Sequence, residues 1–265
     1  MFDLEPHGPD TFVGIGPRYP WGGLFGGQIV AQALRAAAAT VDPAQQVHSL
    51  RAYFIRRGDH TEPIRFEVDR IRNGRSFSTR RVVARQAIGA ILNLEASFHA
   101  EEVTADIETV AISSEVPSPE TLVSDAWSES FDRRDVPKGV LPDDERTGAG
   151  RNAAWMRVTA PIGDDQLLHR CWMAYMSDDM PADAVRRSHP DFRDTDGITY
   201  VASLDHTIWF HRPLRADEWH LYDVTCHTFV GARGLSVGHV FALDGTHVAT
   251  IAQEVLVRDA RQKPD

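Results

Sequence analysis

The chain has 265 residues, enough for one large domain or two of ordinary size, and it is 42% hydrophobic and 25% charged, as water-soluble globular proteins are. Its formal net charge of −10 argues against a surface that attracts nucleic acid. No apolar run approaches the roughly 20 residues that a membrane-spanning helix needs, so we expect no membrane span.

The N-terminal segment and the cysteines indicate the compartment. Residues 1–10 are acidic and contain proline, unlike a secretory signal. Cys171 and Cys226 are the only cysteines, and they form neither a CxxC motif nor a metal-ligand spacing, which suits a reducing environment. We therefore expect a cytoplasmic protein. No HExxH, Walker A or dinucleotide glycine pattern appears, so we expect no metal and no cofactor.

The first half of the chain predicts one helix followed by strands. Residues 26–35 begin with two glycines, continue into a run of alanines and have helical periodicity. Apolar and charged residues then alternate over residues 64–69, and apolar and polar residues alternate over residues 92–98. This alternation is typical of half-buried strands.

A basic segment interrupts this acidic protein. Ten arginines lie between residues 51 and 85, against four acidic residues. Guanidinium groups bind phosphate oxygens in bidentate fashion, so the segment is suited to a phosphorylated ligand. The alternative is a set of solvated strand faces, which the general exposure of charged residues favours.

The second half follows a segment with a different composition. Residues 103–126 are rich in Glu, Ser, Thr and Pro and predict a linker. A second helix is expected from about residue 164 to residue 179, ended by Pro181, which cannot continue a helix. In the last predicted strand, these side chains fall on one face: Ala249, Ile251, Gln253, Val255 and Val257.

The two halves can be laid over each other as a repeat. Residues 53–56 (Tyr-Phe-Ile-Arg) align with residues 209–212 (Trp-Phe-His-Arg), and Glu95 then falls on Gln253. Neither half alternates strands with helices. We therefore predict an α+β fold of two tandem repeats, each with a long helix packed on a curved antiparallel β-sheet. The predicted domains are residues 1–104 and 127–265, joined by a linker at 105–126.

Two short motifs suggest catalytic or metal chemistry but lack its context. Residues 234–238 match the G-x-S-x-G nucleophile elbow around Ser236, yet a strand pattern continues after this serine and too little chain follows for an acid and a histidine. His206 and His211 lie an odd number of positions apart on a predicted strand, so they point to opposite faces and cannot share a metal.

Three polar residues disturb the apolar patterns. Asp178 continues the apolar stripe of the second helix near its C-terminus, where the helix dipole disfavours negative charge. Gln253 interrupts the apolar face of the last strand, and a buried amide needs hydrogen-bond partners. Ser203 lies in a strand pattern. From pattern alone, an exposed acid at a frayed helix end and a serine bonded to the local backbone are the favoured interpretations of Asp178 and Ser203.

Several longer motifs occur in a fixed order and spacing. In the first half they are Phe25-Gly26-Gly27-Gln28, His48-Ser49, Tyr53 to Asp59, Asn73 to Val82 and Ala96-Ser97-Phe98. In the second half they are Ala174-Tyr175-Met176-Ser177-Asp178, Leu204-Asp205-His206, Trp209 to Pro213, Ala232-Arg233-Gly234 and Gln253-Glu254. With these motifs the chain resembles acyl-CoA thioesterase II, the TesB-like family of double-hotdog enzymes, over nearly its whole length.

The resemblance implies a double hotdog fold and the hydrolysis of fatty acyl-CoA to a free fatty acid and CoA. It places a catalytic trio at Asp178, Ser203 and Gln253, whose side chains would hold one water molecule for direct attack, with Asp178 as general base. The best-known members carry Thr where this chain has Ser203, and the hydroxyl is retained. The segment after Asp178 departs from the more apolar sequence of the family, because it continues as Asp179-Met180-Pro181.

The resemblance also implies an acyl-CoA partner and a homodimer or higher homo-oligomer. Two other functions stay open. The first is an enoyl-CoA hydratase of the same fold, in which Asp205 and His206 would mimic the catalytic pair. The second is a non-catalytic acyl-CoA-binding module. A structural scaffold protein would leave the polar residues on apolar faces unexplained.

Overall fold

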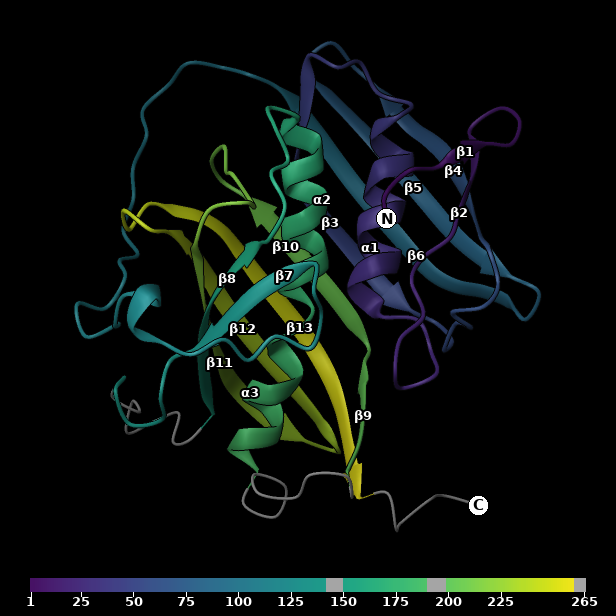
Figure 1. Cartoon of the computed structure of the whole chain (residues 1–265). Helices are drawn as coiled ribbons and strands as arrows, with labels where there is room; N and C mark the ends of the chain where they lie inside the picture. Colours follow the sequence, from purple (N-terminus) through teal and green to yellow (C-terminus); the bar gives the residue numbers. More distant parts are fainter. Residues whose placement is uncertain (142–149, 190–198, 260–265) are drawn as a thin grey trace. The chain divides into compact units, whose positions relative to one another are not determined.

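The computed structural model describes residues 1–141, 150–189 and 199–259 (Figure 1). The chain forms two compact units, and each takes segments from both halves of the sequence. Unit 1 comprises Met1–Asp106, Asp164–Met176 and Thr207–Phe210. Unit 2 comprises Ile107–Gly163, Ser177–His206 and His211–Asp265. The domain boundaries at residues 104 and 126 stay a prediction.

Unit 1 is built on an antiparallel sheet with the strand order β1-β2-β4-β5-β6-β3. Its strands are β1 (Glu5–Pro6), β2 (Thr11–Gly14), β3 (Gln45–Phe54), β4 (Ile64–Asn73), β5 (Phe77–Gln86) and β6 (Gly89–Ala100). The later part of β10 (Asp205–Phe210) follows β3 in the strand order. The predicted alternation holds, because Ile64, Phe66 and Val68 on β4 are buried.

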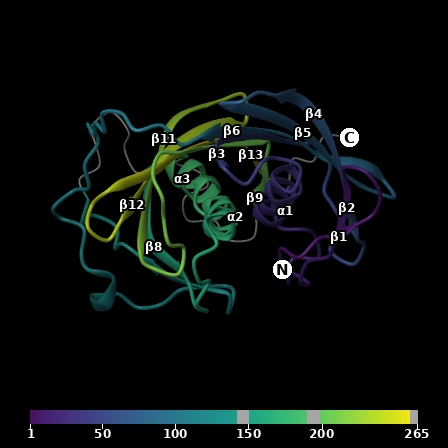
Figure 2. The ribbon, with the colours of Figure 1, turned by 90° about the horizontal axis from the view of Figure 1, so that it is seen from above.

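Helix α1 (Gly26–Ala38) lies on one side of the unit 1 sheet, against β3 to β6 (Figure 2). The helix predicted over residues 26–35 is therefore confirmed. Small side chains let it approach the sheet closely, because its alanines are almost all buried. At its entry, a Cβ atom on Gly27 would lie 2.2 Å from the backbone oxygen of Tyr175 in α2 (Gln166–Ser177), so this contact between the two helices requires glycine.

Several arginines of the basic segment form ion pairs or hydrogen bonds with other groups of the protein. Arg81 pairs with Asp69 across neighbouring strands, and Arg85 pairs with Glu67. Arg80 is only 2% exposed, and its guanidinium donates to Oγ1 and the backbone oxygen of Thr40, just beyond the end of α1. A cation is favourable there, since the carbonyl oxygens at a helix C-terminus carry partial negative charge. The prediction of solvated strand faces is confirmed for the pairs of Arg81 and Arg85.

Unit 2 contains antiparallel strands in the order β13-β12-β11-β8-β7, and β9 also pairs with β13. Its strands are β7 (Phe131–Asp135), β8 (Arg151–Val158), β9 (Thr199–Ser203), β11 (His220–Val230), β12 (Arg233–Ala242) and β13 (His247–Asp259). All five residues that were expected on one face of β13 are buried.

Helix α3 (Pro181–Ser188) packs on the strands of unit 2, against β8, β11, β12 and β13 (Figure 1). Its Val185 forms a core cluster with Cys226, Val255 and Val257. A Cβ atom on Gly234 would lie 2.2 Å from Val185 Cγ1, so glycine allows the helix to approach β12. The cysteine is a free thiol, as is Cys171, and both are buried.

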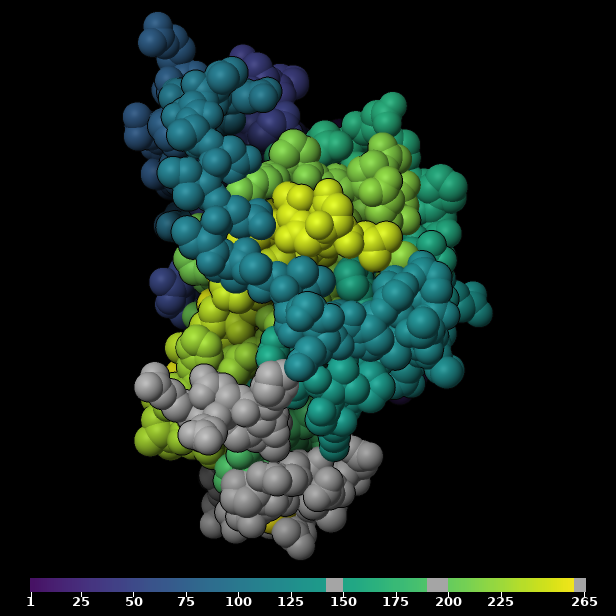
Figure 3. Space-filling view, turned by 90° about the vertical axis from the view of Figure 1, so that its left-hand side faces the viewer, coloured from purple at the N-terminus to yellow at the C-terminus, as the bar shows by residue number. Residues whose placement is uncertain are grey.

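The segment predicted as a linker forms an outer layer of unit 2 from residue 107 onward. Pro117 accepts a hydrogen bond from Trp155 Nε1 at 2.9 Å, and Glu108 forms an ion pair with Arg212 at 2.9 Å. Apolar side chains of this segment pack against the core around Trp155 and Phe241: Val110, Ile112, Val116 and Leu122. Figure 3 shows the teal segment on the surface beside yellow and green residues of the later part of the chain.

The proposed alignment of Glu95 with Gln253 is wrong by one residue. The strand pairing skips Ile91 in β6 and Val248 in β13, and Ala96 lies five positions after the first as Gln253 lies five positions after the second. Because successive strand residues face opposite sides, a shift of one residue reverses the face. Glu95 is accordingly exposed, whereas Gln253 is fully buried.

None of the helices described here combines the length and the apolar character of a membrane span.

Candidate functional site

Three polar side chains meet within unit 2. Ser203 Oγ donates a hydrogen bond to Asp178 Oδ1 at 3.2 Å, and Gln253 Nε2 donates to the same oxygen at 3.0 Å. Gln253 Nε2 also donates to Ser203 Oγ at 2.6 Å. The three residues that stood out in the sequence are therefore mutual hydrogen-bond partners, although Asp178 and Ser203 are 25 positions apart and Asp178 and Gln253 are 75 positions apart.

The local fold explains how each side chain arrives there. Helix α2 ends at Ser177 and α3 begins at Pro181, so Asp178 lies in the short turn between them. Proline suits the first position of a helix, where its missing N–H is not needed. Ser203 is the last residue of β9 and pairs with Val255, two residues from Gln253 on the adjacent strand β13. Cross-strand neighbours at this spacing are within reach of long side chains.

The site is largely closed off from solvent. Asp178 is 7% exposed and Gln253 is 0% exposed, whereas Ser203 is only half-buried. The interpretations of Asp178 as an exposed acid and of Ser203 as a serine bonded only to local backbone are therefore wrong. A carboxylate this deep is stabilised by the hydrogen bonds that it accepts, because desolvation alone would disfavour its charge.

A buried histidine lies behind Gln253. His206 Nδ1 is 2.6 Å from Gln253 Oε1, and His206 Nε2 is 2.8 Å from Ser177 Oγ. Burial lowers the pKa of His206 to about 4, so the imidazole is neutral at physiological pH. The sequence did not indicate that His206 or Ser177 contacts Gln253. A histidine next to an aspartate, or a serine at a helix end, is common and does not by itself identify a site.

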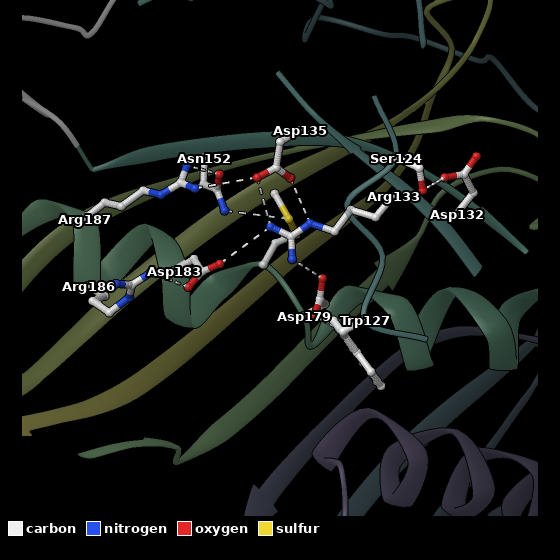
Figure 4. Close-up of polar contacts among 11 residues, drawn as sticks. Ser124, Trp127, Asp132, Arg133, Asp135, Asn152, Asp179, Asp183, Arg186 and Arg187 are labelled. Carbon is white, nitrogen blue, oxygen red and sulfur yellow. Dashed lines mark hydrogen bonds and ion pairs between the residues drawn. The ribbon is translucent and has the colours of Figure 1, made fainter. Parts of the chain in front are cut away.

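A charged network holds the turn that carries Asp178 (Figure 4). Asp179 follows Asp178 directly, and its carboxylate accepts hydrogen bonds from Trp127 Nε1 at 2.6 Å and Arg133 Nη1 at 2.7 Å. Arg133 also forms ion pairs with Asp135 at 2.8 Å and Asp183 at 3.6 Å. Three carboxylates thus surround one guanidinium, and two of them lie at the α2–α3 turn and in the first turn of α3.

The pair of Arg133 and Asp179 is buried, since each side chain is 9% exposed. Burial opposes the charge of Arg133, but attraction from Asp179, Asp135 and Asp183 outweighs it and raises the pKa. Burial raises the pKa of Asp179, and Arg133 and Trp127 oppose that increase only in part. Asp179, the polar residue at which the sequence departs from the family pattern, therefore has its hydrogen-bond and ion-pair partners inside unit 2.

The G-x-S-x-G match is structural. Ser236 lies in the middle of β12 with 1% exposure, and its Oγ donates to the backbone oxygen of Gln253 at 3.3 Å. A nucleophile elbow needs a strand-to-helix turn, and strand β12 continues past this serine. Among residues 1–141, 150–189 and 199–259, no group of three or more His, Cys, Asp or Glu side chains is arranged to hold a metal ion.

Replacing Ser236 with alanine should leave kcat within about threefold of wild type, because this hydroxyl makes only an ordinary hydrogen bond worth about 1 kcal/mol. Steady-state hydrolysis assays of the purified variant check this expectation. Loss of activity by a factor of a hundred or more, with an unchanged circular dichroism spectrum, would restore the serine-hydrolase interpretation.

The low pKa of His206 predicts how stability depends on pH. The unfolded imidazole has a pKa near 6.5 and the folded one about 4, so the unfolded state binds more protons between these values. The contribution of His206 to the free energy of unfolding is therefore nearly complete at pH 7 and is lost as the pH falls below 6.5. The loss from this one group is about 3 kcal/mol between pH 7 and pH 4. Urea unfolding at both pH values measures the loss, and a His206→Asn variant should lose about 3 kcal/mol less. Equal losses in the two proteins would contradict the assignment.

Comparisons with known proteins give the family. A family model described as the acyl-CoA thioesterase N-terminal domain matches residues 16–99, and one described as the acyl-CoA thioesterase C-terminal domain matches residues 108–257. The chain belongs to the acyl-CoA thioesterase family. The resemblance seen in the sequence is thus confirmed, and the enzyme is a thioester hydrolase.

Individual relatives agree with this assignment. Acyl-coenzyme A thioesterase 8 of Mus musculus is 34% identical to the enzyme, over 97% of this chain and 88% of the relative. Acyl-CoA thioesterase 2 of Haemophilus influenzae is 31% identical, over 89% of this chain and 87% of the relative. The crystal structure of acyl-CoA thioesterase II TesB2 from Mycobacterium marinum superposes with a TM-score of 0.87 and 38% identity, covering 97% of this thioesterase and 96% of that chain.

The comparisons also support the fold. A protein from Alicyclobacillus acidocaldarius with a hot dog fold has a TM-score of 0.78 at 20% identity, over 100% of this chain and 97% of its own. This thioesterase is therefore a hotdog-fold protein rich in antiparallel sheet.

Proposed function

We propose that this thioesterase hydrolyses fatty acyl-CoA to a free fatty acid and CoA, by direct attack of a water molecule that Asp178, Ser203 and Gln253 hold. The observation that carries the proposal is the mutual hydrogen bonding of these three side chains at 2.6 to 3.2 Å within unit 2. Their chemistry is complementary, since it combines one ionisable acceptor, one amide donor and one hydroxyl that can donate and accept.

In this mechanism Asp178 is the general base. A carboxylate has about four acceptor positions, so it can accept the proton of a water molecule while it keeps its contacts with Ser203 and Gln253. Ser203 Oγ donates to Asp178 and accepts from Gln253, and its second lone pair can accept a hydrogen from the water. The hydroxyl and the amide thus position the water, and the carboxylate removes its proton as the thioester carbonyl is attacked.

The charge balance of the reaction follows from these roles. The oxygen of the water bonds to the thioester carbon, and its proton passes to Asp178. When the C–S bond breaks, the electron pair leaves with the CoA thiolate, which takes the proton back from Asp178. The enzyme returns to its starting state without a covalent acyl-enzyme.

The hydratase alternative requires a histidine that exchanges protons with the substrate. His206 is fully buried, and its two ring nitrogens lie at hydrogen-bond distance from Gln253 and Ser177. This arrangement favours hydrolysis over hydration, because the imidazole already uses both nitrogens on protein groups.

Thiol release from a series of acyl-CoA substrates of different chain lengths tests the function. We expect the enzyme to release free CoA thiol and to show no hydration of crotonyl-CoA. Tight binding of acyl-CoA without thiol release would instead identify a non-catalytic binding module, and hydration of crotonyl-CoA would identify a hydratase.

We propose further that the fold is a double hotdog, with repeats at residues 1–104 and 127–265 and a linker at 105–126. Corresponding hydrogen bonds in the two units support it. Ile55 N donates to Ile91 O at 2.9 Å in unit 1, and His211 N donates to Val248 O at 2.8 Å in unit 2. The acceptors Ile91 and Val248 each lie five positions before the equivalent strand residues Ala96 and Gln253.

Assembly into a homodimer or larger homo-oligomer stays a proposal drawn from the resemblance, and a cytoplasmic location stays a proposal drawn from the N-terminal segment and the two cysteines. Light scattering of the purified enzyme measures the first, and fractionation of cells that express the protein measures the second. A monomer at micromolar concentration would contradict the proposed assembly.

A further inference from the structure

The buried imidazole of His206 has a defined role toward the proposed trio. It contacts neither Asp178 nor Ser203 through the described hydrogen bonds of its ring, but it lies directly behind the amide of Gln253. Its Nδ1 is 2.6 Å from Gln253 Oε1, and its Nε2 is 2.8 Å from Ser177 Oγ. His206, Ser177 and Gln253 are each 0% exposed. The donor and acceptor in each of these two hydrogen bonds depend on which ring nitrogen of His206 carries the hydrogen.

The amide oxygen of Gln253 sets the direction of both hydrogen bonds of His206. Gln253 Oε1 is an amide oxygen and can only accept, so His206 Nδ1 must carry the hydrogen. Burial keeps the imidazole neutral, so Nε2 has no hydrogen and accepts from the hydroxyl of Ser177. The Asp178 carboxylate can only accept, so the Gln253 amide turns its nitrogen toward Asp178 and its oxygen toward His206, and the Ser177 hydroxyl, which can donate, matches the Nδ1–H tautomer.

The opposite orientation of the amide is unfavourable. If the amide turned by 180°, its oxygen would face Asp178 Oδ1 and Ser203 Oγ, which now lie 3.0 Å and 2.6 Å from Nε2. The carboxylate would lose a donor and meet a second acceptor. The terminal torsion of a glutamine is soft, so the side chain itself does not choose between the two orientations. A donor on the far side of the amide adds to this preference, because it satisfies the amide oxygen only in the observed orientation.

We propose that His206, as the Nδ1–H tautomer with its Nε2 accepting from Ser177, is a positioning residue that helps to hold the Gln253 amide toward Asp178 and Ser203. This inference rests on the proposed function, because it gives Gln253 its role in holding the nucleophilic water. His206 acts through Gln253 and exchanges no proton with the substrate. It is distinct from the three residues that would contact the water.

Two matched variants separate the ring nitrogens. The side-chain amide nitrogen of asparagine lies near the place of Nδ1, whereas that of glutamine reaches the place of Nε2. His206→Asn should therefore keep the donor to Gln253 Oε1 and retain kcat within about threefold. His206→Gln should lose that donor and lower kcat by about tenfold, the rate equivalent of one lost hydrogen bond, with KM within about twofold.

A double variant tests whether His206 acts through Gln253. The combination of His206→Gln with Gln253→Ala should be no slower than Gln253→Ala alone, since an orienting group has no effect once its amide is removed. Multiplied losses would show that His206 acts on something else. Equal losses in His206→Asn and His206→Gln would also overturn the proposal.

The tautomer has a readout that needs no substrate. Long-range ¹H–¹⁵N spectra of the ¹⁵N-histidine-labelled wild-type enzyme, assigned with His206→Asn, should show a neutral ring protonated at Nδ1. A ring protonated at Nε2 would mean that the Gln253 amide is turned and would overturn the proposal. If the wild-type enzyme released no thiol from acyl-CoA, the proposed function would fail, while the spectrum would still decide the orientation of the amide.

Discussion

Replacing Asp178 with asparagine is expected to lower kcat by about 10²–10⁴-fold while the protein stays folded, because this is the usual contribution of a general base. The asparagine keeps an Oδ1 atom, which can still accept the hydrogen bonds from Ser203 at 3.2 Å and Gln253 at 3.0 Å. The substitution therefore removes the negative charge and the proton acceptor with little change in shape. Steady-state thiol release by the variant, with circular dichroism as the check on folding, measures the loss.

Two controls give this result its meaning. Ser203→Ala removes one contact to the water and should lower kcat by only about tenfold, as expected for one hydrogen bond. Asp69→Asn changes an exposed carboxylate that pairs with Arg81 in unit 1, and its kcat should equal that of the wild type. If Asp178→Asn retained kcat within threefold, the role of Asp178 as the base would be wrong.

Replacing Arg133 with methionine is expected to reduce the free energy of unfolding by about 3–5 kcal/mol, since it leaves a buried charge without its partner. The Asp179 side chain, 9% exposed, would keep the hydrogen bond from Trp127 Nε1 but lose its ion pair. Asp183, which also pairs with Arg133, would then repel it without the guanidinium. Urea unfolding at pH 7 measures the change.

A second arginine–aspartate pair is a matched control for burial. Arg81→Met breaks the pair with Asp69, in which the side chains are 47% and 53% exposed, and should cost at most about 1 kcal/mol. Adding Asp179→Asn to Arg133→Met should recover part of the lost stability, because it removes the unpaired charge. Equal costs for Arg133→Met and Arg81→Met would contradict the importance of the buried network.

The sequence predicted the helix α1 and the strand faces well, because their signals are local. Alternation marks the buried face of β4 and β13 directly, and a run of alanines behind two glycines marks α1. Asp178 and Gln253 also stood out locally, each as a polar group on an apolar face. Their convergence did not follow from these patterns, and only the family resemblance placed them together before the structure was known.

The remaining parts of the site depend on long-range contacts. Arg133 and Asp179 are separated by 46 positions, and nothing in either neighbourhood distinguishes them from the surface arginines and aspartates of unit 1. The hydrogen-bond partners of His206 are Ser177 and Gln253, which lie 29 and 47 positions away in the sequence. Pairings over such distances are set by the register of β9 and β13 and by the α2–α3 turn, which single-sequence patterns do not encode.

The register itself shows why the repeat alignment was wrong. Glu95 and Gln253 look equivalent as polar residues in similar strands, yet Ala96 and Gln253 are the residues that lie five positions after the one that the strand pairing skips in each strand. An alignment of similar residues does not detect a shift of one position, but such a shift moves every side chain of the strand to the opposite face. The corresponding site in unit 1 therefore has an alanine where unit 2 has the buried amide.

The central claim is that the trio activates water without becoming acylated, and mass spectrometry of the enzyme after many turnovers of acyl-CoA in H₂¹⁸O tests it most directly. The expected result is ¹⁸O in the released fatty acid, while the peptides that contain Asp178 and Ser203 keep their original masses. Labelled oxygen in the Asp178 peptide, or an acyl group on the Ser203 peptide of enzyme quenched during turnover, would show that a side chain of the enzyme makes the first attack.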